Sequence, residues 1–167
     1  MHGSLRLLRG GACLAVAGLA GCAVVAPATG TSQAELLKRW GAPTSRYVMS
    51  GGTRLEYATG PYGRTTWMVD LDALGHVTQA RQVLGEAEFL AVQTQAAHGM
   101  GRKDLLRWLG RPGERRHGGW PGGEVWSWRY PTNDCLWFQV SISGTGEVRD
   151  GAFGLDPMCS SPADGRH

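Results

Sequence analysis

The chain has 167 residues, enough for one domain or for two very small repeats. Its 17 basic and 14 acidic residues give a formal charge of +3, but two of the basic residues, Arg6 and Arg9, lie in a segment that we expect to be removed. The remaining 15 basic and 14 acidic residues nearly balance, which excludes nucleic-acid binding driven by net charge.

The first 21 residues have the pattern of a secretory signal peptide. After Arg6 and Arg9, residues 10–20 are small, apolar and uncharged, and a small-residue cleavage site follows. The tetrapeptide Leu19-Ala20-Gly21-Cys22 resembles the lipobox that lipoprotein signal peptidase cleaves. We therefore predict that residues 1–21 are removed and that Cys22 begins the mature chain.

Three other interpretations of this segment stay open. Cys22 is an incidental cysteine in an apolar helix, or ordinary cleavage follows Ala26-Pro27-Ala28. The third is an uncleaved anchor formed by residues 10–26, since about 17 residues is the shortest helix that spans a bilayer.

The lipobox resemblance implies a lipid anchor on Cys22. Its thiol would carry a thioether-linked diacylglycerol, with acyl chains such as palmitate, and two or three chains suffice for stable anchoring. Ala23 follows the cysteine, and by resemblance to Gram-negative sorting rules a residue other than aspartate favours the outer membrane. We expect a protein that faces the periplasm, with residues 22–30 as the lipidated tether.

The chain contains an internal repeat. Residues 30–43 match residues 99–112 without a gap at two glycines, two leucines and a proline. Each segment predicts a short helix that ends at a glycine followed by proline. Ser32 and Glu35 predict a capping box at the start of the first helix.

Strand patterns follow each of these helices. Period-two alternation of apolar and polar residues predicts half-buried antiparallel strands over residues 54–57, 66–72, 75–81, 126–130, 136–142 and 146–152. Residues 86–97 predict a further helix. The expected fold is α+β: two tandem units, residues 31–85 and 86–155, each a helix plus a three-stranded antiparallel sheet.

The cysteines left after acylation of Cys22 are Cys135 and Cys159. In an oxidising compartment we predict that they form a disulfide, which would fasten the C-terminal tail, residues 156–167, to the sheet. The entropic model gives about 3 kcal/mol for a loop of this size. Two free thiols are the alternative. Because neither cysteine has a partner at ligand spacing, no zinc site or other cofactor is expected.

The search for catalytic residues finds no arrangement that favours an enzyme. There is no GxSxG motif, and His76, His98 and His117 lie in predicted turns or helix ends. Asp70 and Asp72 share a strand face opposite Trp67, which we interpret as a solvated sheet face. An acid–base pair, or a calcium site with Glu56, are the alternatives, and the latter lacks EF-hand spacing.

Aromatic residues supply the candidate binding surface. Trp126, Trp128 and Tyr130 share one strand face beside Arg129, and Trp137 lies on the next strand. These five are the candidate protein-binding residues, because exposed tryptophans with an adjacent arginine are typical interface anchors. The alternative, which we favour for the first three aromatics, is packing beneath the helices, whereas Trp137 is expected to be partly exposed.

Residues 86–153 carry a set of short motifs, and residues 30–85 carry them more loosely. They are Phe89, Gly99-Met100, Leu105-Leu106, Gly110-Arg111-Pro112, Trp128-Arg129-Tyr130, and Gly146 with Val148. This pattern resembles the SmpA/OmlA (BamE-like) family of outer-membrane lipoproteins. The tandem arrangement is similar to the β-lactamase-inhibitor-protein-like fold, in which two units present one continuous concave sheet.

The resemblance implies a non-enzymatic protein-binding module in outer-membrane assembly or envelope integrity, with the barrel-assembly machinery as the candidate partner. The alternative is an inhibitor-like or ligand-binding lipoprotein that captures a periplasmic enzyme or small molecule on its concave sheet.

Overall fold

The computed structural model describes residues 25–60, 64–131 and 135–159. Within these ranges the chain forms three α-helices, eight strands and a short 3-10 helix. In chain order they are α1 (Gln33–Trp40), β1 (Ser45–Met49), β2 (Gly52–Thr59), β3 (Thr65–Asp72), β4 (Val77–Gln82), α2 (Glu86–Ala96), α3 (Arg102–Leu109), β5 (Glu114–His117), β6 (Glu124–Arg129), β7 (Leu136–Ile142), β8 (Val148–Leu155) and η2 (Pro157–Cys159).

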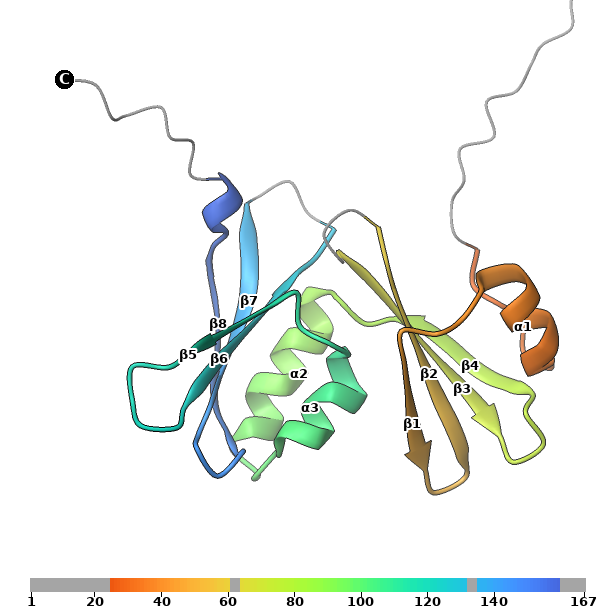
Figure 1. Ribbon diagram of the computed structural model, residues 1–167, viewed down its shortest axis with the longest axis horizontal. Coiled ribbons are helices and arrows are strands. Elements are labelled where there is room, and N and C mark those ends of the chain that lie inside the picture. The colour runs from red at the N-terminus through yellow and green to blue at the C-terminus, as the bar shows by residue number, and fades with distance from the viewer. Residues whose placement is uncertain (1–24, 61–63, 132–134, 160–167) are drawn as a thin grey trace, which may run out of the picture.

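The strands form two separate four-stranded antiparallel sheets, in the orders β1-β2-β3-β4 and β5-β6-β7-β8 (Figure 1). The expected fold of two units, each with a helix and a three-stranded sheet, is therefore wrong. Each sheet has an additional strand, β1 or β5, and the described helices are short and unevenly placed, one before the first sheet and two before the second. The two sheets do not join into one continuous sheet.

The two strands that the sequence did not predict are both edge strands. All four residues of β5, Glu114–His117, are exposed, so the strand has no apolar face for a period-two pattern to reveal. In β1 the apolar Val48 is 83% exposed while Tyr47 is half-buried, which disturbs the pattern. Charged side chains on an edge strand also discourage pairing with other chains.

The repeat predicted from the sequence is present at the helix ends. Ser32 and Glu35 form the predicted capping box on α1, since each backbone N–H donates to the other's side chain. Gly41 ends α1 with φ +77° and ψ −162°, and Gly110 ends α3 with φ +78° and ψ −167°. This backbone region is accessible essentially to glycine alone.

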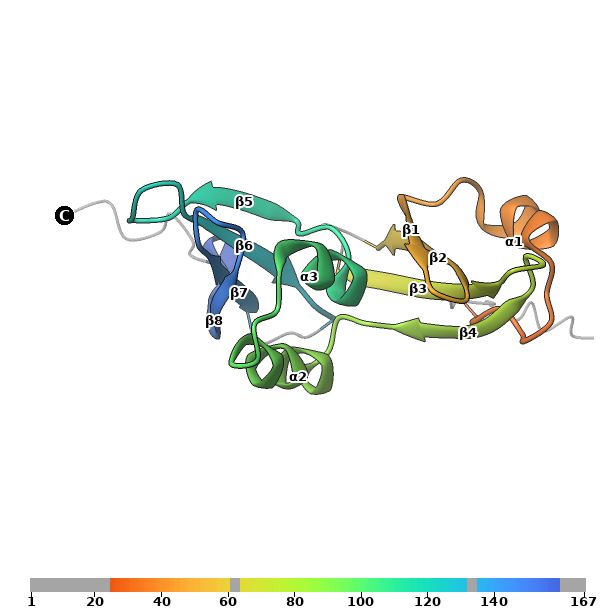
Figure 2. The ribbon, with the colours of Figure 1, turned by 90° about the horizontal axis from the view of Figure 1, so that it is seen from below.

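The first sheet is covered on both faces. Val69 and Leu71 pack with Leu36 of α1, on the face predicted to be apolar. Met68, on the opposite face and 1% exposed, belongs to the larger core formed by α2, α3 and the second sheet. Helices α2 and α3 therefore lie between the two sheets (Figures 1 and 2). The face of Asp70 and Asp72, interpreted as solvated, is only partly so: the Asp72 side chain is 40% exposed, whereas that of Asp70 is 23% exposed beside Arg54.

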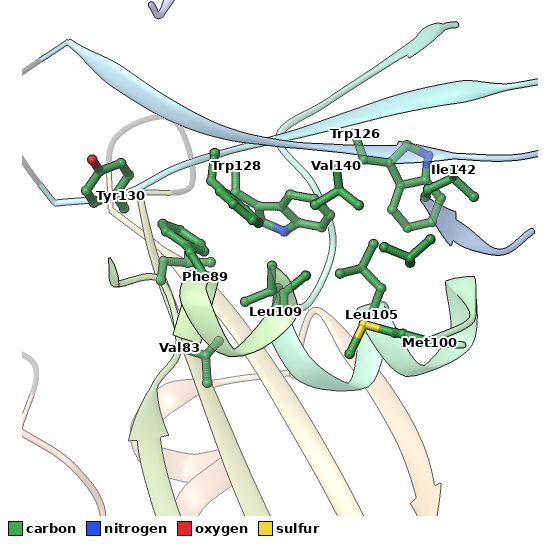
Figure 3. Packing of buried hydrophobic residues seen from close by; sticks show 14 of the residues in the cluster. Val83, Phe89, Met100, Leu105, Leu109, Trp126, Trp128, Tyr130, Val140 and Ile142 are labelled. Atoms are coloured by element: carbon green, nitrogen blue, oxygen red, sulfur yellow. The ribbon is translucent and has the colours of Figure 1, made fainter. Parts of the chain in front are cut away.

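The larger core lies between α2, α3 and the second sheet. Trp126 and Trp128 point from β6 toward the helices, where Leu105 and Leu109 of α3 lie (Figure 3). Phe89 of α2 stacks on Phe138 of β7, with ring centroids 4.4 Å apart. Burial of these large apolar side chains is the main source of stability for this half of the chain.

Arg54 of β2 joins the first sheet to the end of α3. Its Nε and Nη2 donate to the carboxylate of Asp70 at 2.6 and 2.8 Å, and its Nη1 donates to the backbone carbonyl of Arg107 at 2.8 Å. The last carbonyls of a helix lack partners within the helix and carry partial negative charge, so a cation stabilises them. Asp70 orients that cation, which explains its position on this face.

Glu56, also on β2, holds the chain just beyond the same helix. Its carboxyl oxygens accept hydrogen bonds from the Tyr47 hydroxyl at 2.5 Å and from the backbone N–H of Arg111 at 2.9 Å. Glu56 has no exposed surface. Burial and the neighbouring Glu56 raise the pKa of Tyr47, so its hydroxyl stays protonated and donates. Arg54 and Glu56 together fix α3 against the first sheet.

The predicted pairing of Cys135 with Cys159 is present in the structure, with Cα atoms 5.7 Å apart. Asp156 lies between them in space: its N–H donates to the Cys135 carbonyl, and its carbonyl accepts from the Cys159 N–H. Its carboxylate accepts two hydrogen bonds from Arg129, at 2.5 and 2.9 Å. The end of the described chain is thus fastened to β6 and β7 by covalent and ionic contacts.

Replacing Asp156 with asparagine is expected to lower the free energy of unfolding by about 2 to 4 kcal/mol at neutral pH, because this carboxylate is buried against Arg129. The hydrogen bonds from Arg129 hold the pKa of Asp156 below its ordinary value. The ion pair therefore stabilises the folded chain above about pH 3.9, the value for an unfolded aspartate, and this stabilisation is lost as pH falls through the lower folded pKa. Urea unfolding at neutral and acidic pH should show the variant and the parent converging at low pH, and a constant difference would contradict this.

Three predicted features lie outside the described residues: the signal peptide, residues 1–21, the lipidation site Cys22, and the last residues of the tail, 160–167. None of the described helices is both long and apolar enough to cross a membrane. The lipid anchor and the outer-membrane location therefore stay predictions.

Candidate functional site

The aromatic residues predicted to bind a partner are mostly part of the core. Trp126, Trp128 and Tyr130 are buried in the cluster beneath α2 and α3, which agrees with the packing alternative. The expected exposure of Trp137 is wrong, because this side chain is 2% exposed. Arg129 is held by Asp156 and lies 5.3 Å from the centre of the Trp137 ring.

Trp137 is buried although its strand face carries no helix. Arginine side chains from two other strands cover it instead. The guanidinium of Arg116 lies 5.8 Å from the centre of the ring. The guanidinium of Arg129, which is paired with Trp137 between β6 and β7, lies 5.3 Å from it. Such cover depends on which strands are paired, because Arg116 belongs to the edge strand β5. The alternation within β7 alone could not predict it.

An exposed tryptophan is found in the hairpin that joins β5 and β6. Trp120 is 40% exposed at the tip of this loop. Its indole ring lies directly on the backbone of Gly118 and Gly123, where an added Cβ atom would overlap the ring. The loop is closed by a hydrogen bond from the Gly118 N–H to the Gly123 carbonyl at 2.7 Å. Because these two glycines lack side chains, the Trp120 ring can pack against their backbone while it stays partly exposed.

The strand beside this tryptophan is basic. Arg115, Arg116 and His117 are all exposed. The Arg115 guanidinium lies 4.1 Å from the centre of the Trp126 ring, and Arg116 faces Trp137 on the other side of the sheet. Stacking on an aromatic face is favourable for arginine and restricts its motion. The buried tryptophans of the predicted binding set therefore position two surface arginines.

We name Arg115, Arg116, His117 and Trp120 the hairpin surface. It combines the two residue types that most often dominate binding energy at interfaces, tryptophan and arginine. Because both are held by neighbouring groups before any partner arrives, less conformational entropy is lost on binding. The basic residues and the glycines of the loop can be read from the sequence. The exposure of Trp120, in contrast to the buried tryptophans of β6, cannot.

A cleft of about 560 Å³ lies between the first sheet and the α2–α3 pair. Met49, Arg54 and Arg81 line it from the sheet, His98 and Met100 from the α2–α3 connection, and Asp104, Arg107 and Trp108 from α3. Its volume falls within the range of small-ligand sites. The cleft is lined by residues of both halves of the chain, so neither repeat predicts it alone.

Among the described residues, the histidine and carboxylate side chains are not arranged as a catalytic group. Asp72 caps the β3–β4 turn by accepting from the N–H groups of His76 and Leu74, and these hydrogen bonds lower its pKa. Asp70 is bound to Arg54, and Glu56 to Tyr47. In this part of the chain no three His, Cys, Asp or Glu side chains are grouped to hold a metal ion.

No protein-family model, characterised protein or solved structure shows significant similarity to this chain. The resemblance to the BamE-like lipoproteins rests on the short motifs alone and stays a prediction.

Proposed function

We propose that this chain is a non-enzymatic, lipid-anchored envelope protein that binds a partner protein through the hairpin surface. The observation that carries the proposal is the exposed Trp120 ring, which packs against Gly118 and Gly123 in the loop that follows a strand with two exposed arginines. A loop that only reverses the chain direction requires neither an exposed indole nor glycines beneath it. A surface that is ordered before binding is the expected property of an interaction site.

The charge of the hairpin surface defines the partner. Arg115, Arg116 and His117 are exposed on one four-residue edge strand, with Arg115 on the Trp126 face of the sheet and Arg116 on the Trp137 face. An acidic surface that contacts this edge would therefore match them. An apolar pocket in that acidic surface would receive Trp120. By the family resemblance, a component of the outer-membrane barrel-assembly machinery is the first candidate, and a lipid anchor on Cys22 would hold the chain beside such a partner.

Replacing Trp120 with alanine is expected to weaken partner binding by about thirtyfold, the loss typical of a tryptophan at the centre of an interface. The lipidated chain is used as bait in detergent-solubilised envelopes, and the captured proteins are identified by mass spectrometry. The affinity of each partner for the parent chain and the variant is then measured with purified components.

The matched control is Leu74→Ala, which removes an apolar side chain that is 83% exposed in the β3–β4 turn. A partner retained by the control and lost by the tryptophan variant supports the hairpin surface. Barrel-assembly components in that set support the assembly role, whereas an unrelated soluble protein alone would favour the inhibitor-like alternative. Equal capture by Trp120→Ala and the parent would exclude the hairpin as the binding site.

A further inference from the structure

We propose that the cleft between the first sheet and the α2–α3 pair binds a small organic anion, a carboxylate or phosphate attached to an apolar group. This cleft is separate from the hairpin surface, because no residue of the hairpin surface lines it. Three observations support the proposal: the hydrogen-bond and ion-pair partners of three arginines, the apolar residues beside them, and the position of these arginines on opposite walls of the cleft.

The arginines of the cleft differ in how they are neutralised. Arg54 is fully occupied, since its three nitrogens donate to Asp70 and to the Arg107 carbonyl. Arg81 of β4 is half-buried, and among the described residues its guanidinium has no hydrogen bond or ion pair. A partly buried cation without a counter-charge is unfavourable, and an incoming anion would relieve this.

Arg107 provides the second available charge, from the opposite wall. Its contact with Asp104 is long, 3.5 Å, and both side chains are exposed. A surface pair of this kind contributes little to stability, so Arg107 can exchange it for a ligand at low cost. With Arg81 on one wall and Arg107 on the other, the lining has a net positive charge even when Asp104 is counted and Arg54 is regarded as neutralised.

The remaining lining determines the rest of the ligand. Met49, Met100 and Trp108 contribute apolar surface next to the arginines. Methionine side chains are flexible and polarisable, and a tryptophan ring offers a flat surface for a planar group. A free inorganic ion would leave this surface unused, whereas an anion with a small aromatic or aliphatic part would cover it.

Because Arg81 and Arg107 come from opposite walls, an anion that contacts both would join the first sheet to α3. Binding to the folded chain alone stabilises it by mass action. The ligand is therefore expected to raise the thermal unfolding temperature by an amount that grows with the logarithm of its concentration divided by Kd.

Isothermal titration of the full-length chain in a non-ionic detergent tests the proposal. The probes are phenyl phosphate and phenylacetate, and benzyl alcohol is their uncharged counterpart. We expect saturable binding of at least one anion, with no saturable binding of the alcohol. Loss of one charge-assisted contact in Arg81→Gln should weaken the affinity by about tenfold or more. Arg107→Gln, on the other wall, should weaken it as well.

Arg46→Gln is the matched control, because it removes an exposed arginine of β1 that does not line the cleft. Thermal unfolding of each unliganded variant verifies folding, and Arg81→Gln should fold normally because its guanidinium supports no other described residue. Trp120→Ala should bind the probes like the parent chain, which separates this site from the hairpin surface. Failure of both anions to bind, equal binding of benzyl alcohol, or an unchanged affinity in both cleft variants would overturn the proposal.

Discussion

Replacing Glu56 with alanine is expected to lower the free energy of unfolding by about 3 kcal/mol, more than any single surface substitution in the chain. The variant leaves two donors without an acceptor, the Tyr47 hydroxyl and the backbone N–H of Arg111. Both lie at the junction between the first sheet and the end of α3, and the lost carboxyl also leaves a cavity there. Urea unfolding followed by tryptophan fluorescence measures the change.

Two milder variants separate the contributions of the Tyr47 and Arg111 hydrogen bonds to this loss of stability. Tyr47→Phe removes one donor together with its need for an acceptor, so a loss of about 1 kcal/mol is expected. Glu56→Gln keeps an acceptor for the Arg111 N–H and an amide that can donate to the Tyr47 oxygen, so it should lie between the parent and the alanine variant. If Glu56→Ala unfolded with the same free energy as the parent, this carboxyl would not hold the two halves together.

Replacing Gly110 with alanine is expected to cost about 2 to 5 kcal/mol from two separate causes. The backbone at this position has φ +78° and ψ −167°, which side chains disfavour. A Cβ atom would also lie 2.9 Å from the Glu56 carboxyl group and 3.0 Å from Thr66. Both neighbours are buried.

The repeat supplies a control that separates these causes. Gly41 has nearly the same backbone angles at the end of α1, but an added Cβ atom there meets nothing within 4 Å. Gly41→Ala should therefore show the backbone cost alone, about 1 to 3 kcal/mol. The difference between the two variants, measured by urea unfolding, is the cost of contact between the halves. If both variants lost the same free energy of unfolding, Glu56 and Thr66 would move away from the added methyl group at no energetic cost.

Both substitutions act where α3 ends, and this position also governs the candidate sites. One side of α3 provides Arg107 and Trp108 to the cleft, and β5, which begins five residues after α3, carries the hairpin surface. Variants that loosen this junction are expected to weaken anion binding without any change in the lining residues. The two halves are thus coupled through buried polar contacts rather than through a flexible linker.

Most of the features predicted correctly from the sequence depend on residues close together in the chain. These include the capping box at Ser32, the glycine ends of α1 and α3, the helix α2, and the strands whose apolar residues alternate. The pairing of Cys135 with Cys159 was predicted by elimination, since the reasoning needed only a count of cysteines and an oxidising compartment. Apart from the disulfide, whose cysteines are 24 residues apart, the physical cause in each case is a backbone angle, a local hydrogen bond or a one-sided pattern of burial within a few residues of sequence.

Which faces and edges are covered depends instead on how the sheets and helices pack. Strands β1 and β5 have no consistent apolar face, because an edge strand owes its place to backbone pairing with its neighbour. Asp70 is bound by Arg54, which also contacts the end of α3. Trp137 is buried by arginines of other strands, whereas Trp120, in a loop, is exposed. These outcomes depend on contacts between residues far apart in the sequence, which local periodicity does not encode.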